Sequence, residues 1–148
     1  MNWIERATRT LELESQAIAQ LVGQLDGAFE AVGQLILDRP GRVIMTGIGK
    51  SAIIAQKLVA TFNSTGTPAV FMHAADAIHG DLGLVQSDDV VLCISKSGNS
   101  PEIKALTPVI KSRSIPLIGM VGNRSSHLAQ QADYILDTTV SKEACPLD

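Results

Sequence analysis

The chain has 148 residues, of which 45% are hydrophobic and 18% are charged, so it suits one folded domain and not a disordered segment. Twelve basic and fifteen acidic residues are mixed along it and give a net charge of −3, which argues against a general binder of nucleic acids or anionic membranes. No apolar run approaches the ~20 residues of a membrane span, and we expect no signal peptide in the charged residues 1–14. Cys93, one of two cysteines, lies inside an apolar run, which favours a reducing, cytoplasmic compartment.

Residues 1–40 are predicted to form helices that precede the core. Apolar residues recur at seven-residue spacing, at Ile4, Leu11, Ile18 and Leu25, and this spacing indicates an amphipathic helix. Gly23 and Gly27 interrupt the pattern, and a second helix is predicted over 28–38, ended by Pro40. The apolar stripe either contributes to an oligomer interface or packs on its own domain, and the sequence leaves both open.

Five short apolar runs follow in residues 41–148 and alternate with helical segments. The runs are rich in β-branched residues and predict buried strands at 42–46, 69–72, 89–94, 116–121 and 134–136. Helices are predicted between them at 51–63, 101–113 and 125–132, the first with one face made of Ile54, Leu58, Thr61 and Phe62. This alternation predicts an α/β fold, a three-layer αβα sandwich with a parallel sheet, in a single domain over 1–148.

In such a sheet, ligands bind beyond the carboxyl ends of the strands, and Gly-Ile-Gly-Lys-Ser (47–51) follows the first strand. It fails as a Walker A loop because Ile44 stands where a glycine is required. It matches a dinucleotide fingerprint only formally, since the second strand ends at 72–73 without a carboxylate. What remains is a turn in which Gly49, Lys50 and Ser51 accommodate an anion at a helix N-terminus, or a tight turn with a solvated lysine.

The segment Ser-Lys-Ser-Gly-Asn-Ser (95–100) follows the third strand and places three hydroxyl groups before Pro101, a residue type common in a first helical turn. Hydroxyls and free N–H groups at a helix N-terminus hold phosphate without a metal. Each serine alone is explained as a helix cap, but three of them beside a second Gly-Lys-Ser loop favour phosphate binding. Glu102 is either a base close to that phosphate or a carboxylate stabilised by the helix dipole.

His73 and His79 flank a short alanine-rich segment, with Asp76 and Asp81 nearby. Their spacing is not that of a metal site. A histidine that transfers protons or orients substrate oxygens is therefore favoured over a metal ligand.

Several motifs resemble one known group in their order and spacing. They are Gly-x-Gly-Lys-Ser (47–51), Ser-Thr-Gly-Thr-Pro (64–68), His-Gly-Asp-Leu-Gly (79–83), Ser-x-Ser-Gly (95–98) and Lys-Glu-Ala-Cys-Pro-Leu (142–147). With these motifs the chain resembles the sugar isomerase (SIS) domain of the D-arabinose 5-phosphate isomerases. The resemblance extends from about residue 5 to the last residue. Ser-x-Ser-Gly is shared across the wider SIS superfamily, whereas the motifs at 64–68, 79–83 and 142–147 are specific within it.

The resemblance implies an SIS fold and interconversion of D-ribulose 5-phosphate and D-arabinose 5-phosphate, the first step toward the Kdo sugar of lipopolysaccharide. It implies catalytic roles for Lys50, His79, Glu102 and Glu143. It also implies substrate or phosphate contacts at Gly49, Ser51, Thr65, His73, Ser95, Ser97 and Ser100. The family works as a homotetramer with active sites between subunits and needs no cofactor, and we expect no metal site.

The sequence departs from the family pattern in three respects. The family loop reads Ser-Asn-Ser-Gly-Glu, whereas here Lys96 and Asn99 replace the amide and the carboxylate. The lysine either adds an anion contact or faces solvent. The chain stops at Asp148, so we expect it to lack the C-terminal helix of the family, with a further active-site histidine, and the tandem regulatory CBS domains of longer members.

Moving a carbonyl between C1 and C2 of a sugar requires a base that removes a carbon-bound proton, which leaves a cis-enediol, and groups that shuttle protons between two oxygens. Glu102 or Glu143 is predicted as the carbon base, with Lys50 and His79 acting on the oxygens. The alternatives are a non-catalytic regulatory SIS module that binds a phosphosugar, an isomerase of another phosphosugar, and a nucleotide-binding module. The acid–base set favours an enzyme, because simple binding does not need it.

Overall fold

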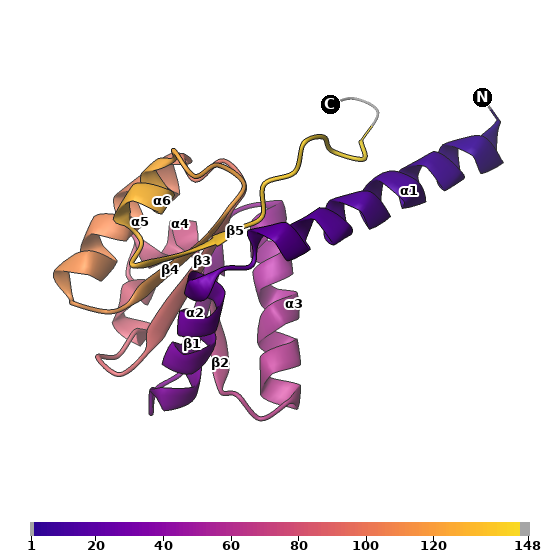
Figure 1. The fold of residues 1–148 in the computed structure, drawn as a ribbon. Helices are drawn as coiled ribbons and strands as arrows, with labels where there is room; N and C mark the ends of the chain where they lie inside the picture. Colours follow the sequence, from indigo (N-terminus) through magenta and orange to yellow (C-terminus); the bar gives the residue numbers. More distant parts are fainter. Residues whose placement is uncertain (1, 146–148) are drawn as a thin grey trace.

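The computed structural model describes residues 2–145 and begins with helices that precede the sheet (Figure 1). They are α1 (Trp3–Leu21), the 3₁₀ turn η1 (Val22–Gln24) and α2 (Gly27–Asp38). The predicted second helix is therefore confirmed, and it begins one residue earlier than expected. Residues 146 and 147 of the last motif lie outside the described range.

Five parallel strands form one sheet in the order β2-β1-β3-β4-β5. Their bounds are β1 (Val43–Gly47), β2 (Ala69–His73), β3 (Val90–Ser95), β4 (Leu117–Val121) and β5 (Tyr134–Asp137). Every residue of β1 and β3 is buried, because helices cover both faces of these central strands. The predicted parallel sheet is confirmed, with each strand end within one residue of its predicted position.

Different helices cover the two faces of the sheet, which gives the predicted three layers. α2 and α3 (Lys50–Ser64) pack on the face that carries Met45, Leu92 and Ile118. α4 (Ala74–Ala77), α5 (Pro101–Ser112) and α6 (His127–Gln131) pack on the face that carries Ile44, Val91 and Cys93. Ile44 and Met45 are neighbours that point to opposite layers, as the two-residue period of a strand requires.

The connection from β2 to β3 contains two short helical turns, α4 and η2 (Asp81–Leu84), that the sequence did not predict. Each has four residues, which is too short for a helical apolar period to show. Buried Ala74, Ala77 and Leu82 pack this segment against the core. The alanine-rich segment between His73 and His79 is therefore held in place.

The buried face of α3 coincides only in part with the apolar face that the sequence indicates. Ala52 and Ala55 are buried and Phe62 is packed against the core, whereas Ile54 is 53% exposed. Leu58 of the predicted face also packs against the core, while Ile54 points to solvent because the helix uses small residues where it approaches the sheet closely.

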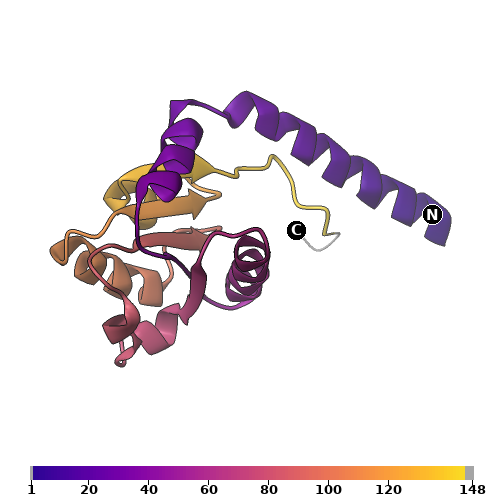
Figure 2. The same cartoon turned by 90° about the horizontal axis from the view of Figure 1, so that it is seen from below.

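α1 projects away from the sheet in two perpendicular views (Figures 1 and 2). None of its residues is buried, and the stripe of Ile4, Leu11 and Ile18 is 66–78% exposed. The alternative in which this stripe packs on its own domain is therefore wrong. No helix within residues 2–145 is both long and apolar enough to cross a membrane.

An ion pair between half-buried Arg42 and buried Asp89 closes the amino edge of the sheet, opposite the candidate site. The Asp89 carboxylate accepts hydrogen bonds from the Arg42 backbone, at 2.8 Å, from the Arg42 guanidinium and from the Gln86 N–H. Burial alone would raise the pKa of Asp89, but these hydrogen bonds and the Arg42 charge outweigh it and lower the pKa. The ionised carboxylate thus stabilises the start of β1 and β3.

Candidate functional site

The carboxyl ends of the five strands form one row at one edge of the sheet. Most of the predicted site residues lie in the loops that come directly after these strand ends. The pairs that define the row are His73 with Gly47, Gly47 with Ile94, Ser95 with Val121 and Val121 with Asp137. Because neighbouring strands lie about 4.8 Å apart, the loops after β1, β3 and β4 are adjacent. The structure therefore places the Gly-Lys-Ser loop after β1 and the serine-rich loop after β3 side by side.

The loop after β1 opens α3 with a glycine. Gly49 occupies the cap position at φ 57° and has no side chain with which to cap the helix. Lys50 is the first residue of the helix and is exposed, while Ser51 is half-buried. The backbone N–H groups and an ammonium are thus presented together at the end of β1.

The loop after β3 turns tightly between the strand and α5. The Ser95 hydroxyl is buried and accepts a hydrogen bond from the Gly98 N–H at 3.0 Å, so this serine shapes the turn. Ser97 is exposed, and its hydroxyl accepts from the Asn99 N–H at 3.3 Å. The Ser100 hydroxyl occupies the cap position and is buried without a hydrogen-bond partner among residues 2–145.

Helix α6 braces the loop after β3, a role that the sequence analysis missed. Asn99 accepts a hydrogen bond from the His127 N–H at 3.0 Å, and the Gly98 carbonyl accepts one from the Leu128 N–H at 3.0 Å. Gly98 has φ 63°, and a Cβ there would lie 2.5 Å from the Cβ of Ser126. Only a glycine fits this turn without moving α6.

The N-termini of the four long helices divide into two kinds within the described chain. Asn2 and Asp26 cap α1 and α2 through their side chains, whereas α3 and α5 have no side-chain cap. The two uncapped helices start from the neighbouring strands β1 and β3, at the same edge of the sheet. First-turn N–H groups without side-chain partners, together with the positive end of each helix dipole, form a ready site for an anion.

Three of the predicted acid–base residues, Lys50, Glu102 and Glu143, lie at these two loops. Glu102 is half-buried in the first turn of α5, and Glu143 forms an ion pair with Lys96, directly after β3. His73 ends β2, with its Nδ1 3.7 Å from Asp76. His79 is exposed beyond α4, and within residues 2–145 no hydrogen bond or ion pair joins it to Lys50 or Glu102.

Thr65 is the one predicted contact that the chain does not bring to this edge. It follows the C-terminal end of α3, whose fifteen residues span about 22 Å from Lys50. Its hydroxyl donates to the carbonyls of Thr61 and Phe62 in its own helix. Within one chain α3 carries Thr65 to the edge opposite the serine loops, so its contact with the substrate stays a prediction.

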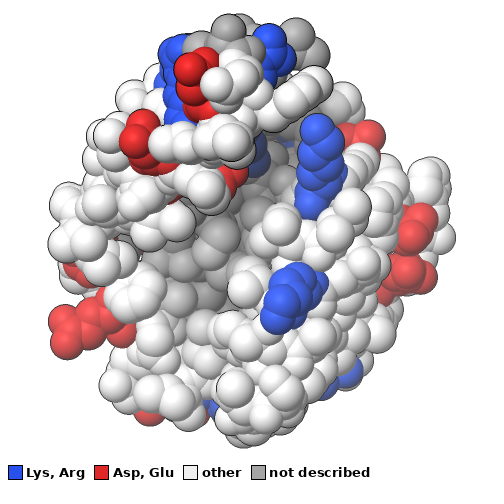
Figure 3. Space-filling view, turned by 90° about the vertical axis from the view of Figure 1, so that its right-hand side faces the viewer, with Lys and Arg blue, Asp and Glu red and all other residues white. Residues whose placement is uncertain are grey.

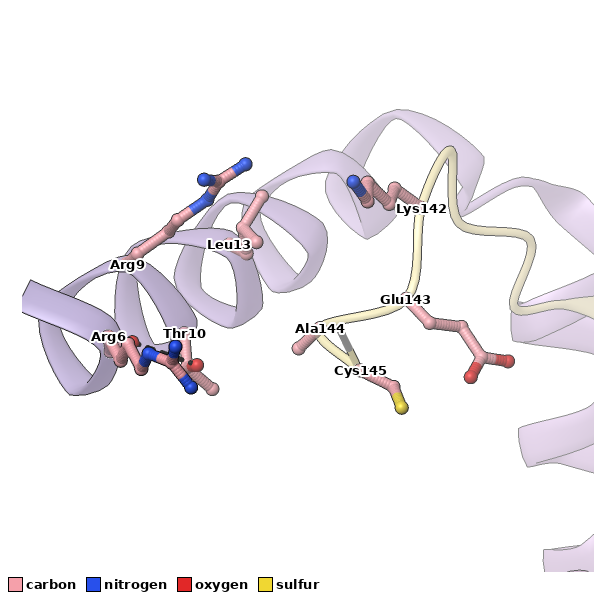
Figure 4. A pocket seen from close by; sticks show the side chains of 8 residues that line it. All are labelled: Arg6, Arg9, Thr10, Leu13, Lys142, Glu143, Ala144 and Cys145. Atoms are coloured by element: carbon pink, nitrogen blue, oxygen red, sulfur yellow. Dashed lines mark hydrogen bonds between the residues drawn. The ribbon is translucent and has the colours of Figure 1, made fainter. Parts of the chain in front are cut away.

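A cavity of about 360 Å³ lies between α1 and the chain beyond β5. Figure 4 shows Arg6, Arg9 and Leu13 of α1 on one side and Lys142, Glu143, Ala144 and Cys145 on the other. Figure 3 looks onto the side from which α1 projects and shows a hollow with Lys or Arg side chains above and beside it. No group of three or more His, Cys, Asp or Glu side chains within residues 2–145 is placed to hold a metal ion.

The fold and the two open helix N-termini define a doubly wound α/β protein with a candidate anion site at the carboxyl edge of its sheet. The family model of the SIS domain matches residues 36–147. The chain belongs to the SIS domain family, and the resemblance that its motifs indicated is confirmed.

Named relatives lie close in both sequence and structure. The chain is 45% identical over 148 residues to arabinose 5-phosphate isomerase KdsD of Pseudomonas aeruginosa, covering all of this chain and 45% of that protein. It is 44% identical over 139 residues to arabinose 5-phosphate isomerase GutQ of Escherichia coli K12, covering 94% and 43%. The solved structure of E. coli CFT073 c3406 in complex with arabinose 5-phosphate superposes with a TM-score of 0.93 at 38% identity, covering 99% of this chain and 80% of that one. The chain thus spans less than half the length of the curated relatives that it matches.

Proposed function

We propose that the chain is the catalytic SIS domain of an aldose–ketose isomerase that interconverts D-ribulose 5-phosphate and D-arabinose 5-phosphate, on the route to Kdo and lipopolysaccharide. The observation that carries this proposal is the pair of uncapped helix N-termini at the ends of β1 and β3. The names of the relatives support the substrate, and the sugar phosphate bound in the solved neighbour supports the ligand class.

The phosphate lies at the two helix N-termini, where backbone N–H groups and hydroxyls meet. Ser100 offers its unpartnered hydroxyl, and Ser51 and Ser97 flank the same edge. Ser95 contributes through the turn that it closes and keeps its hydroxyl proton available for donation. Contacts to the phosphate hold the far end of the sugar, so that the reacting carbons are positioned by groups that do not react.

The reaction needs one base at carbon and proton transfer between two oxygens. Starting from the aldose, Glu102 or Glu143 takes the proton from C2, the electron pair forms the C1–C2 double bond of a cis-enediol, and O1 gains a proton. The base then returns its proton to C1 while O2 loses its hydrogen and becomes the ketone oxygen. Lys50 and His79 stabilise and protonate the oxygens, and His73, at the end of β2, contacts the substrate.

The proposal includes a cytoplasmic homotetramer with active sites between subunits. The exposed apolar stripe of α1 supports an association of chains, because 66–78% exposure at Ile4, Leu11 and Ile18 is costly in water. The free cysteines Cys93 and Cys145 are consistent with a reducing compartment.

Proton exchange in heavy water tests the function. The chain is incubated with arabinose 5-phosphate in ²H₂O, and deuterium at C1 and C2 and formation of the ketose are followed by NMR. Exchange together with the ketose supports the isomerase. Binding without exchange would instead indicate a regulatory module, and faster exchange with another sugar phosphate would reassign the substrate.

A matched pair of glutamate variants tests the base. Glu102→Gln is expected to lower the exchange rate at least ~100-fold, the size typical of a lost general base. Glu30→Gln is the control, because Glu30 also lies in the first turn of a long helix, α2, and is exposed. Equal exchange rates in Glu102→Gln and the unaltered chain would remove Glu102 from the mechanism and leave Glu143.

A further inference from the structure

The chain beyond β5 crosses the carboxyl edge of the sheet, and we call residues 138–145 the tail. The Thr138 N–H donates to the Val121 carbonyl at 2.8 Å, and the Thr139 hydroxyl donates to the Gly122 carbonyl at 3.2 Å. The Gln24 side chain donates to the Thr139 carbonyl at 2.9 Å. These bonds lead the tail from the end of β5 across the end of β4, toward β3.

At the end of β3 the tail meets Lys96, whose ammonium pairs with the Glu143 carboxylate. The backbone of this lysine is held in place, because its carbonyl accepts a hydrogen bond from the Gly122 N–H at 3.0 Å. Its stem lies against Gly122, where an added Cβ would be 3.1 Å from the Lys96 Cγ. A glycine at 122 therefore leaves room for the stem to run along the edge and reach the tail.

Glu143 has other cations within the same region. Arg6, Arg9 and Lys142 line the cavity between α1 and the tail. In Figure 4 the Glu143 side chain points away from α1, on the side opposite to these arginines. Charge alone does not explain why Glu143 pairs with Lys96 and not with another cation. The pairing follows from the fixed backbone of Lys96 and from the path of the tail.

We infer that Lys96 is a positioning residue that holds Glu143, and with it the tail, beside the Ser97–Ser100 loop. The catalytic consequence of this inference rests on the proposed function. The tethering of the tail by Lys96 does not depend on that function. It gives Lys96 a third role, since the sequence offered only an anion contact or a solvated side chain. The lysine acts on the reaction through the glutamate and not through the substrate.

Mobility of the tail tests the tether without any substrate. Cys145 is exposed two residues beyond Glu143, whereas Cys93 is buried, so a thiol-reactive spin label attaches to the tail of the folded chain. Lys96→Gln is expected to increase the mobile fraction of the label at least ~2-fold, and Lys96→Arg to preserve the unaltered spectrum. About 0.5 M salt should act like Lys96→Gln, because both side chains are partly exposed and their attraction is screened.

Lys104→Gln is the matched control. It removes the same charge from an exposed lysine of α5 whose ammonium makes no hydrogen bond or ion pair within residues 2–145. An unchanged spectrum in Lys96→Gln, or an equal change in Lys104→Gln, would overturn the tether.

The reaction rate tests the catalytic consequence. Lys96→Gln should lower kcat about 2- to 5-fold with little change in KM, a size set by a partly exposed ion pair, and Lys96→Arg should restore it. In a Glu143→Gln background, Lys96→Gln should have no further effect. Additive losses, or a raised KM with constant kcat, would show a direct substrate contact and overturn the positioning role. An unaltered chain without isomerase activity would refute the proposed function and leave the spin-label result standing.

Discussion

Gly98 lies in the serine-rich loop of the candidate site, and a substitution at this position is expected to lower the stability of the fold. Replacing it with alanine imposes the left-handed backbone at φ 63° on a residue with a Cβ, which costs about 1 kcal/mol. The new Cβ would also overlap the side chain of Ser126, whose Cβ lies 2.5 Å from its position. Ser126 and the start of α6 must therefore move.

The cost of that movement follows from two hydrogen bonds. Ser126 caps α6 by accepting from the Ala129 N–H at 3.3 Å, and the cap is worth about 1 kcal/mol. The Leu128 N–H donates to the Gly98 carbonyl at 3.0 Å, and this bond contributes about 1 kcal/mol more. Gly98→Ala is therefore expected to lower the free energy of unfolding by about 3 kcal/mol, and the melting temperature by about 9 °C for a chain of this size.

Gly66→Ala is the matched control for this experiment. Gly66 also has a positive φ, 95°, but no atom lies within 4 Å of a Cβ added there, so only the backbone cost of about 1 kcal/mol, or about 3 °C, applies. Thermal unfolding followed by circular dichroism at one protein concentration compares the two. In a Ser126→Gly background, which removes the overlapping atoms, Gly98→Ala should cost only about 1 kcal/mol more. Equal melting temperatures for Gly98→Ala and Gly66→Ala would refute the overlap with α6.

Other variants test the core and the amino edge of the sheet. Asp89→Asn should lower the free energy of unfolding by about 2–4 kcal/mol at pH 7, because Arg42 loses its buried partner. Since the pKa of Asp89 in the folded chain lies below its ordinary 3.8, the unaltered chain keeps this stabilisation above about pH 4 and loses it as the pH falls further. Urea midpoints measured from neutral pH down into this acidic range should therefore converge for the two proteins. Thr46→Val should raise stability by about 1 kcal/mol, because the fully buried Thr46 hydroxyl has no partner within residues 2–145; a lower urea midpoint would contradict this. A thiol reagent at about pH 8 should modify Cys145 at once and Cys93 only after unfolding, since burial raises the pKa of Cys93 to about 12; equal rates in the folded chain would show that Cys93 is accessible.

The sheet could be predicted from the sequence because its strands are buried on both faces. The run at 89–94 is apolar at every position after Asp89. Such a run predicts a buried strand even when the neighbouring strands are not known. The serine loop at 95–100 was found for a related reason, since ligand groups of a parallel sheet follow its strands directly.

Features that depend on contacts across the fold escaped the sequence analysis. Asn99 is one of several polar residues in its loop, and only the position of α6 shows that it holds the His127 N–H. Thr65 shares a specific motif with the family, but the length of α3 decides at which edge it lies. Lys96 and Glu143 are far apart in the sequence, and no local pattern connects an exposed lysine to a tail carboxylate.

The protruding first helix has a consequence for how the molecule responds to dilution. Most of the stability of a protein helix comes from packing of its apolar face, so α1, with nineteen residues and none of them buried, should depend on contacts that cover its apolar stripe. The five-stranded body buries two hydrophobic clusters of its own. At low concentration the helical arm should therefore fray first while the body persists, so that the order of the arm depends on protein concentration and that of the body does not.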